Sequence, residues 1–334
     1  MDNILSDTAL EEINRYGYVR TQLRLPAPLI GQIRSHFHGI APRASNWSFF
    51  YTNSLHQYAL TRWQRLLFGM KKTFTAKALH KAILGDRYDK TIFGSTDLLP
   101  LVLNECITND IGSFLGDVPL IVAHDIYLEN GRDKASFGFH EDGFGWDNFY
   151  QSGDDLSFYI PLVDLTEETG GRLYVEQNGD KTVRYRDWNR RILEFSEFCQ
   201  SVGAVDERGL VTKESILKSS QLKRIAQQFI KITDGRKHLP KPEPEELKPI
   251  DFKAGEVVLF NNKRYHDIEP WLADHLREVY IIRCVPLYDI GLAPPSHFLN
   301  DVPCNRYLVN DQGRTLMPFT PEDELPQGYP VPVD

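Results

Sequence analysis

Cysteine is scarce in this chain, with four among 334 residues, namely Cys106, Cys199, Cys284 and Cys304. No two of them form a Cys-x-x-Cys pair, so their spacing predicts neither a zinc site nor a disulfide framework. Unreactive thiols in a reducing compartment are the plainest interpretation. The sequence therefore favours a cytoplasmic protein.

Long apolar runs and an excess of basic residues are also missing. No stretch approaches the roughly 18 apolar residues that would span a membrane, and the first residues lack the basic and apolar segments of a signal peptide. The net charge is −8, with both signs intermixed along the chain. This balance argues against nucleic acid or an anionic membrane as an obligate partner. A small-molecule substrate is the expected partner, and no pattern indicates an oligomeric state.

The hydrophobic period changes about a third of the way along the chain. Before that point it is helical and predicts helices over residues 6–16 and 27–37. Ser6 or Asp7 can cap the first helix, and Gly17 can end it. Beyond it the pattern predicts strands over residues 120–128, 136–140, 156–163, 172–176, 256–260 and 278–285, with a turn at Gly170-Gly171.

A charged helical segment interrupts these strands between residues 181 and 249, with helices expected over 188–199 and 213–232 and a linker over 237–249. We therefore expect a mainly β protein with flanking helices, whose core is a double-stranded β-helix of the jelly-roll or cupin-like kind. The expected parts of this single domain (1–334) are a helical support (1–118), a jelly-roll core (119–180 and 250–286), a helical insert that is either a lid or a packing decoration (181–249), and a C-terminal extension with little regular structure (287–334).

The most informative chemical pattern is His140-Glu141-Asp142, which a distant histidine, His266, completes. Residues two apart on a strand project to the same side, so His140 and Asp142 point one way and Glu141 the other. Two imidazoles and one carboxylate are the ligand set of non-haem Fe(II) oxygenases. Taken alone, however, the triplet is also readable as a chance polar turn, and His266 as an ordinary surface histidine.

Arg277 follows His266 by eleven residues and offers a planar fork for a carboxylate. A structural salt bridge is the alternative role for it, and Arg264 and Arg283 compete with it as carboxylate ligands. The aromatic residues near the triplet, notably Phe139, Phe144 and Trp146, predict the wall of a dry substrate pocket.

Together these motifs resemble the phytanoyl-CoA dioxygenase-like family of Fe(II)/2-oxoglutarate-dependent oxygenases. The resemblance runs through most of the chain and is carried by residues 10–37, Phe139 to Asp142, Gly170 to Leu173, Lys253 to Phe260, and His266 with Arg277. It implies that Fe(II) is held by His140, Asp142 and His266. It further implies that Arg277 binds the distal carboxylate of 2-oxoglutarate, with Tyr127 and Tyr159 near this cosubstrate. Phe139, Phe144 and Trp146 would lie on the substrate side.

The implied activity is O2-dependent oxidation, chiefly hydroxylation, of an unactivated C–H bond in a small molecule of specialised metabolism, with release of succinate and CO2. Asp142 argues against a halogenase, which has a small residue in its place. Two departures from the family are Ile268, where a small hydroxyl residue is common, and the segment Tyr174 to Asp180, which lacks the usual Pro-Gly-Ser-His. The rival functions are a non-catalytic jelly-roll binding module and a zinc-dependent hydrolase.

Overall fold

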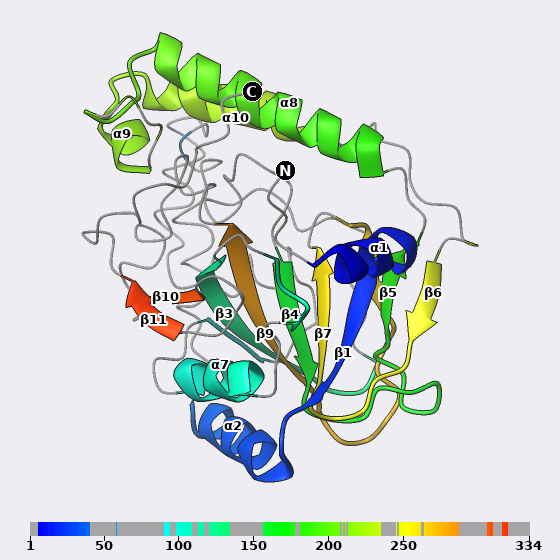
Figure 1. Cartoon of the computed structure of the whole chain (residues 1–334). Coiled ribbons are helices and arrows are strands. Elements are labelled where there is room, and N and C mark those ends of the chain that lie inside the picture. The colour runs from blue at the N-terminus through cyan, green and yellow to red at the C-terminus, as the bar shows by residue number, and fades with distance from the viewer. Residues whose placement is uncertain are drawn as a thin grey trace.

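Two antiparallel sheets form the centre of the protein (Figure 1). The computed structural model describes residues 6–40, 58, 90–93, 98–108, 113–116, 120–133, 156–177, 181–207, 209, 211, 213–234, 245, 247–261, 264–286, 306–309 and 316–319. The chain alternates between the sheets, because β4, β7 and β9 belong to the larger one while β5, β6 and β8 belong to the smaller. This interleaving is the double-stranded β-helix that the sequence predicted.

The larger sheet has the order β1-β7-β4-β9-β3-β10-β11, and β2 also pairs with β3. Its strands are β1 (Tyr18–Arg24), β7 (Glu256–Asn261), β4 (Leu156–Pro161), β9 (Arg277–Pro286), β3 (Leu120–Asn130), β10 (Arg306–Val309), β11 (Leu316–Phe319) and β2 (Lys90–Phe93). The smaller sheet has the order β6-β5-β8, formed by Leu247–Ile250, Leu173–Glu176 and His266–Ile268. Most neighbouring strands in these sheets are distant in sequence. The fold therefore brings the Gly170-Gly171 turn close to the segment that carries His266 and Arg277.

The two faces of the larger sheet have different coverings. Residues that point inward pack with the smaller sheet in one apolar cluster, which includes Tyr159, Phe260 and Trp271. Residues that point outward pack beneath the helices α1 (Asp7–Tyr16), α2 (Ala27–Gly39) and α7 (Leu98–Thr108). Successive strand residues alternate between the two faces. The pairing register therefore decides which side chains of β3 and β9 reach the interior.

The first helix begins and ends as its sequence predicts. The Ser6 side chain accepts a hydrogen bond from the Ala9 amide at 3.4 Å. Gly17 ends the helix in the left-handed conformation, with φ of 82°. A Cβ at Gly17 would come within 2.4 Å of the Glu176 carbonyl oxygen, so the close approach of β5 also requires glycine here.

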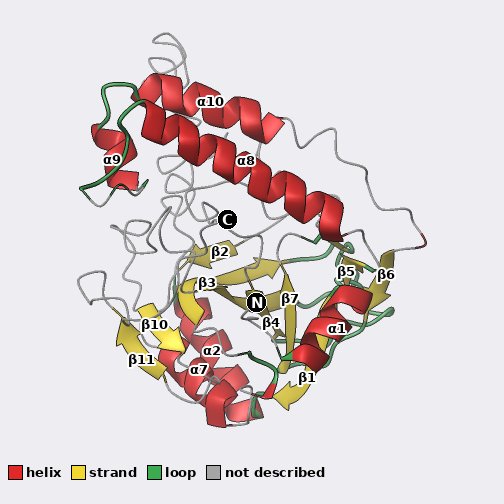
Figure 2. Cartoon of the chain, turned by 45° about the horizontal axis from the view of Figure 1, so that its top comes forward, coloured by secondary structure: helices red, strands yellow, loops and turns green. Residues whose placement is uncertain are grey.

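The insert between the two halves of the core consists of helices α8 (Lys181–Ser201), α9 (Lys213–Lys218) and α10 (Leu222–Asp234). Helices α8 and α10 lie side by side (Figure 2). They share a separate apolar cluster, in which the rings of Phe195 and Phe229 lie 5.6 Å apart. The single helix expected over 213–232 is divided in two at Ser219 to Gln221.

The structure adds short strands to two segments that were expected to have little regular structure. The end of the predicted linker forms β6, which pairs with β5 in the register Leu173↔Ile250. The C-terminal extension contains the β10–β11 hairpin, and Leu308 of β10 pairs with Ile121. Both additions cover the backbone donors and acceptors of an otherwise open strand edge, which short polar segments do not reveal by periodicity. The strand expected over 136–140 lies outside the described residues.

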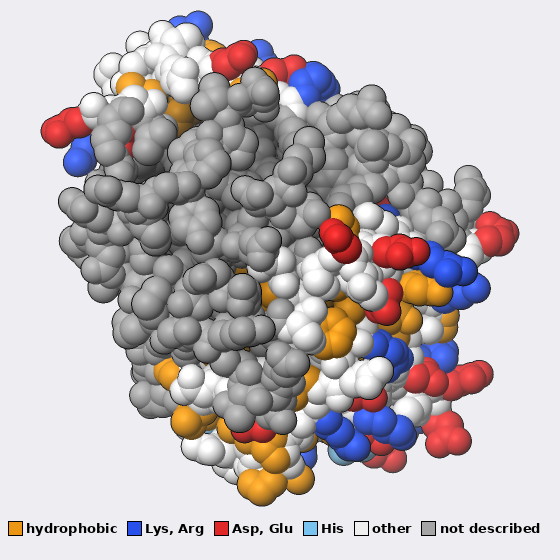
Figure 3. Space-filling model, in the orientation of Figure 1, with side chains coloured by type: hydrophobic (Ala, Val, Ile, Leu, Met, Phe, Trp, Pro, Cys, Tyr) orange, Lys and Arg blue, Asp and Glu red, His pale blue; other side chains and the backbone are white. Residues whose placement is uncertain are grey.

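The charged side chains on the surface agree with the mixed composition of the sequence. Acidic and basic side chains alternate over the described part of the face in Figure 3. Among the described residues, no helix combines the length and apolar character needed to cross a bilayer.

Asp164 supports the turn before β7 and gives a pH-dependent prediction. Its carboxylate accepts a hydrogen bond from the Ala254 amide at 2.8 Å, and this bond is the main reason that the pKa of Asp164 is lowered. A lowered pKa stabilises the fold above the unfolded value of about 4, and the contribution is lost as the pH falls through the lower folded value. Asp164→Asn is expected to lower the melting temperature slightly at pH 7 but not near pH 2. An equal loss at both pH values would contradict this account.

Candidate functional site

Arg277 is fully buried at the start of β9, yet among the described residues the partners of its guanidinium are all neutral. Its Nε donates to the Gly171 carbonyl oxygen at 3.2 Å, and its Nη1 donates to Asn130 Oδ1 at 3.3 Å. Its Nη2 donates to the Tyr159 hydroxyl oxygen at 2.6 Å. Within the described part of the chain, no carboxylate forms an ion pair with it. A buried cation without an anion is costly, so this position favours an anionic ligand.

Tyr159 projects from β4 into the same interior. Its ring packs against Phe252 and Phe260, with centroid distances of 5.6 and 6.1 Å. Burial raises the pKa of Tyr159, although the nearby Arg277 acts in the opposite direction. The phenol is therefore neutral at physiological pH. Its oxygen accepts the bond from Arg277, and among the described residues no acceptor takes its own proton.

The Gly170-Gly171 turn forms the wall behind the guanidinium. Both residues have positive φ, 70° and 66°. A Cβ at Gly171 would lie 2.8 Å from Arg277 Cδ and 2.8 Å from Cε3 of the buried Trp271. Only glycine lets the backbone carbonyl approach the guanidinium this closely.

Gly171→Ala is consequently expected to displace Arg277 and to weaken carboxylate binding by about tenfold or more, because a hydrogen bond to a charged group contributes about 1.5–3 kcal/mol. Gly203→Ala is the matched control, since Gly203 has φ of 71° but nothing within 4 Å of its Cβ position. Both variants carry similar backbone strain. Equal affinities of the two variants in a calorimetric titration with 2-oxoglutarate would refute the role of Gly171.

His266 opens β8 and also points inward. It pairs with Val175 of the inner core, and its ring lies edge-to-face on Phe260 at 5.4 Å. Its Nδ1 lies 2.9 Å from the Arg264 carbonyl oxygen, to which it donates in the tautomer that suits this partner. The lone pair is then on Nε2, which is the form in which histidine binds a metal, oriented by a backbone acceptor. Phe260 contacts both His266 and Tyr159, so the three share one interior.

The structure brings together three of the predicted site residues, His266, Arg277 and Tyr159. The other predicted metal ligands, His140 and Asp142, lie outside the described residues, and so do the predicted substrate residues Phe139, Phe144 and Trp146.

For Tyr127 the structure corrects the expectation of an inward side chain. Tyr127 pairs with Tyr280, which lies three residues after the inward Arg277 and therefore on the opposite face of β9. The Tyr127 ring stacks on Phe37 of α2, with the ring centroids 4.4 Å apart. The inward residue of β3 beside Arg277 is Asn130, which pairs with it in register. Sequence reasoning missed Asn130, because the strand predicted over residues 120–128 ended before it, and only the pairing register shows that it faces the guanidinium.

The competing arginines occupy other positions. Arg264 is buried, and its Nη2 donates at 3.3 Å to the carbonyl oxygens of Ile13 and Asn14, so it caps the C-terminal end of α1. Arg283 lies on the inward face of β9 but six residues beyond Arg277, where it pairs with Ser157.

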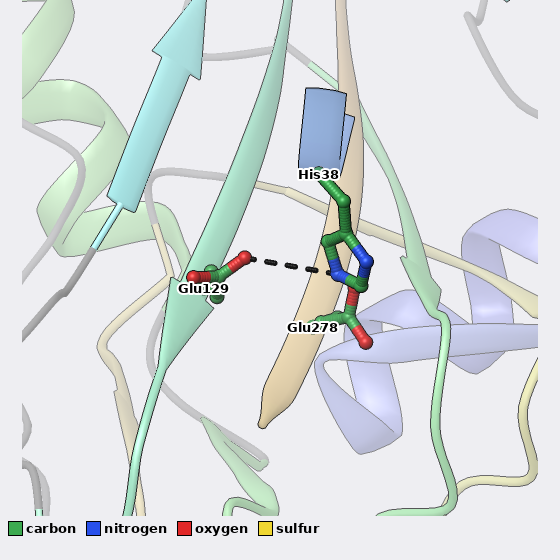
Figure 4. Close-up of side chains that lie close together, drawn as sticks. All are labelled: His38, Glu129 and Glu278. Carbon is green, nitrogen blue, oxygen red and sulfur yellow. Dashed lines mark hydrogen bonds and ion pairs between the residues drawn. The ribbon is translucent and has the colours of Figure 1, made fainter. Parts of the chain in front are cut away.

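A second polar cluster lies on the outer face, where His38, Glu129 and Glu278 converge (Figure 4). Their ligand atoms lie within 4.8 Å of one another, and among the described residues they are the one group that could hold a metal. Glu278 is already balanced by Arg34, whose Nε donates to it at 2.7 Å. We interpret this cluster as an ion network, separate from the inward-facing site.

Comparisons with known proteins give only distant likenesses. No protein-family model matches the sequence, and no curated protein sequence matches it. Solved structures do match. One is the non-heme alpha-ketoglutarate-dependent carbocyclase SnoK from nogalamycin biosynthesis, at 12% identity, 85% coverage of each chain and a TM-score of 0.42. A second is HygX from Streptomyces hygroscopicus with nickel and 2-oxoglutarate bound, at 12% identity, 84% and 87% coverage and a TM-score of 0.41. A third is the non-heme monooxygenase ThoJ–Ni complex, at 12% identity, 94% and 89% coverage and a TM-score of 0.45. At this level of likeness, function has to be inferred from the chain's own residues.

Proposed function

We propose that this chain is an Fe(II)/2-oxoglutarate-dependent dioxygenase that hydroxylates an unactivated C–H bond of a small molecule. The observation that carries the proposal is the fully buried guanidinium of Arg277, which has only neutral partners among the described residues. A zinc hydrolase has no need of such a carboxylate site. A dioxygenase that consumes 2-oxoglutarate needs one beside its metal.

The described residues His266 and Arg277 support a site for both groups. His266 has the orientation of a metal ligand, with Nδ1 directed at a backbone carbonyl oxygen. We propose that it holds Fe(II) together with His140 and Asp142. The bound iron and cosubstrate would supply the O2-dependent oxidation, in which 2-oxoglutarate is converted to succinate and CO2.

The chain's own residues would bind and orient 2-oxoglutarate and would exclude water from the site. Arg277 would form the ion pair with the distal carboxylate of 2-oxoglutarate, and the Tyr159 hydroxyl would donate a second bond to it. Asn130 would hold the guanidinium in place through Oδ1. The apolar inner cluster, which includes Phe260 and Val279, would keep this charge pair in a dry environment and so strengthen it.

On the substrate side, we propose that Phe139, Phe144 and Trp146 contact a molecule with a sizeable apolar body, of the kind made in specialised metabolism. The insert, which has its own apolar cluster, is proposed as a lid over this side.

Tyr159→Phe tests the cosubstrate site with little change in packing, because the ring contacts with Phe252 and Phe260 remain. Removal of the hydroxyl takes away one bond of Arg277 and one donor to the ligand. The expected result is about a tenfold weaker binding of 2-oxoglutarate, with unchanged metal affinity. Unchanged affinity for 2-oxoglutarate in calorimetry would remove Tyr159 from the site.

The activity itself is tested by succinate formation from 2-oxoglutarate. Anaerobically Fe(II)-loaded protein is exposed to O2 with a panel of small metabolites, beside His140→Ala and Arg277→Gln. Turnover that a metabolite stimulates, and that both variants lose, supports the dioxygenase. Metal and 2-oxoglutarate binding without decarboxylation under any condition favours the binding module instead.

A further inference from the structure

Glu278 follows Arg277 in the chain, and its side chain points to the opposite face of β9. It is fully buried, and it accepts hydrogen bonds from His38 Nε2 at 2.7 Å and from the Tyr127 hydroxyl at 2.8 Å on one oxygen. Arg34 Nε donates to its other oxygen at 2.7 Å. Two of these donors come from α2, so a surface helix is tied to the first residues of the strand that carries Arg277.

Glu129 of β3 completes this arrangement. It lies directly opposite Glu278 in the pairing register, and its Oε2 lies 2.9 Å from the Tyr127 hydroxyl oxygen, so the single proton of this hydroxyl can be donated to either carboxylate. His38 reaches from α2 toward both carboxylates (Figure 4). We name this cluster the outer anchor; its members are Arg34, His38, Tyr127, Glu129 and Glu278.

The outer anchor and the carboxylate site lie back to back on consecutive rungs of the same two strands. One rung pairs Glu129 with Glu278 on the outer face, and the next pairs Asn130 with Arg277 on the inner face. Neighbouring strand residues are about 3.3 Å apart, so a movement of the backbone at Glu278 also moves Arg277. The Glu278 carbonyl oxygen also accepts a hydrogen bond from the Leu162 amide at 2.9 Å, which fixes the start of β9 to the end of β4.

Docking of α2 does not in itself require a buried carboxylate. Its apolar residues Leu29, Ile33 and Phe37 already pack into the outer core. A buried ion pair generally adds little net stability compared with apolar packing, and in some proteins buried polar or ionic groups instead fix the conformation around them. A carboxylate at this position, next to Arg277, is therefore better explained by positioning than by adhesion of the helix.

We infer that the outer anchor positions Arg277 for the carboxylate of 2-oxoglutarate, so that α2 is energetically coupled to the cosubstrate site. This inference rests on the proposed function, because it takes Arg277 as the cosubstrate ligand. Members of the outer anchor do not touch the ligand. They act through the backbone of β9 and are positioning residues.

The test measures two affinities by calorimetry, that of Ni(II) for the protein and that of 2-oxoglutarate for the Ni(II)-loaded protein. Arg34→Gln is expected to weaken 2-oxoglutarate binding by about fivefold or more, a typical size for coupling between sites, and to leave Ni(II) binding unchanged. Arg34→Lys, which keeps the charge, is expected to restore most of the affinity. The matched control is Arg20→Gln, which breaks the exposed 3.0 Å ion pair with Glu256 between β1 and β7 and is expected to change neither affinity.

Each outcome has a distinct meaning. If the wild type binds 2-oxoglutarate and Arg34→Gln binds it equally well, the anchor inference is overturned while the proposed function stands. If the wild type does not bind it, or binds it independently of Arg277, the proposed function fails first. Should Arg34→Gln not fold, the half-exposed His38 provides the second variant, His38→Ala, with the same expected loss of 2-oxoglutarate affinity. A loss of Ni(II) and 2-oxoglutarate affinity in equal measure would indicate general unfolding and would also overturn the inference.

Discussion

Replacing Arg277 by glutamine is expected to weaken 2-oxoglutarate binding by about 100-fold or more, without destabilising the ligand-free protein. Truncating one partner of a buried charge pair costs about 2–5 kcal/mol of binding free energy. In the ligand-free protein, however, the guanidinium of Arg277 is buried with only neutral partners among the described residues. Its removal therefore relieves a desolvation cost, and the ligand-free melting temperature should stay the same or rise.

The measurement is a pair of melting curves with and without 2-oxoglutarate, on metal-loaded wild type and Arg277→Gln. The wild type should show a ligand-induced rise in melting temperature that the variant lacks. Arg172→Gln is the contrasting control, because Arg172 bonds twice to Glu269, at 2.7 and 2.9 Å, and its loss should destabilise the ligand-free protein. If Arg277→Gln destabilises the ligand-free protein to a similar degree, Arg277 is a structural arginine.

Replacing His266 by alanine is expected to lower the Fe(II) affinity by more than about 100-fold. Loss of a mere hydrogen-bond partner of a metal ligand costs about 10–100-fold, so loss of a ligand should cost more. The ring is buried and packs on Phe260, which means that His266→Ala also leaves a small cavity. His266→Gln fills more of that space and is expected to show the same metal defect.

His275→Ala is the control for this prediction. His275 lies near His266 in sequence but is exposed, and its ring packs edge-to-face on Trp271 at 5.1 Å. Metal affinity is measured by anaerobic titration with Fe(II), followed by iron analysis of the desalted protein. Wild-type iron content in His266→Ala would exclude His266 from the metal site.

Local patterns were enough to predict helices α1 and α2, the helical insert, and strands β3, β4, β5, β7 and β9, whereas α7, β2, β6, β8, β10 and β11 were not predicted. The Ser6 cap and the Gly17 terminus depend on residues within one turn, and the apolar run of β7 is visible in isolation. The ordered spacing from the glycine turn through His266 to Arg277 also predicted that distant segments meet in one core. The observed jelly roll accounts for this meeting.

The pairing register between neighbouring strands could not be predicted from local sequence patterns. Tyr127 lies within the strand predicted over residues 120–128 and Asn130 lies beyond it, and only the pairing of Asn130 with Arg277 shows that Asn130 is the residue that faces inward. In the same way, β6 and β10 are four-residue strands that exist because a neighbouring strand offers an open edge. The outer anchor was missed for a related reason, since its members are brought together by the docking of α2 on β3 and β9.

The most direct test of the central claim is a calorimetric titration of 2-oxoglutarate into anaerobic, Fe(II)-loaded protein, repeated with metal-free protein and with Arg277→Gln. The account predicts one binding site per chain in the wild type, with an affinity that falls by about 100-fold or more in Arg277→Gln and falls also when the metal is removed. Wild-type protein that holds iron but does not bind 2-oxoglutarate, or binds it as tightly without the guanidinium, would contradict the account.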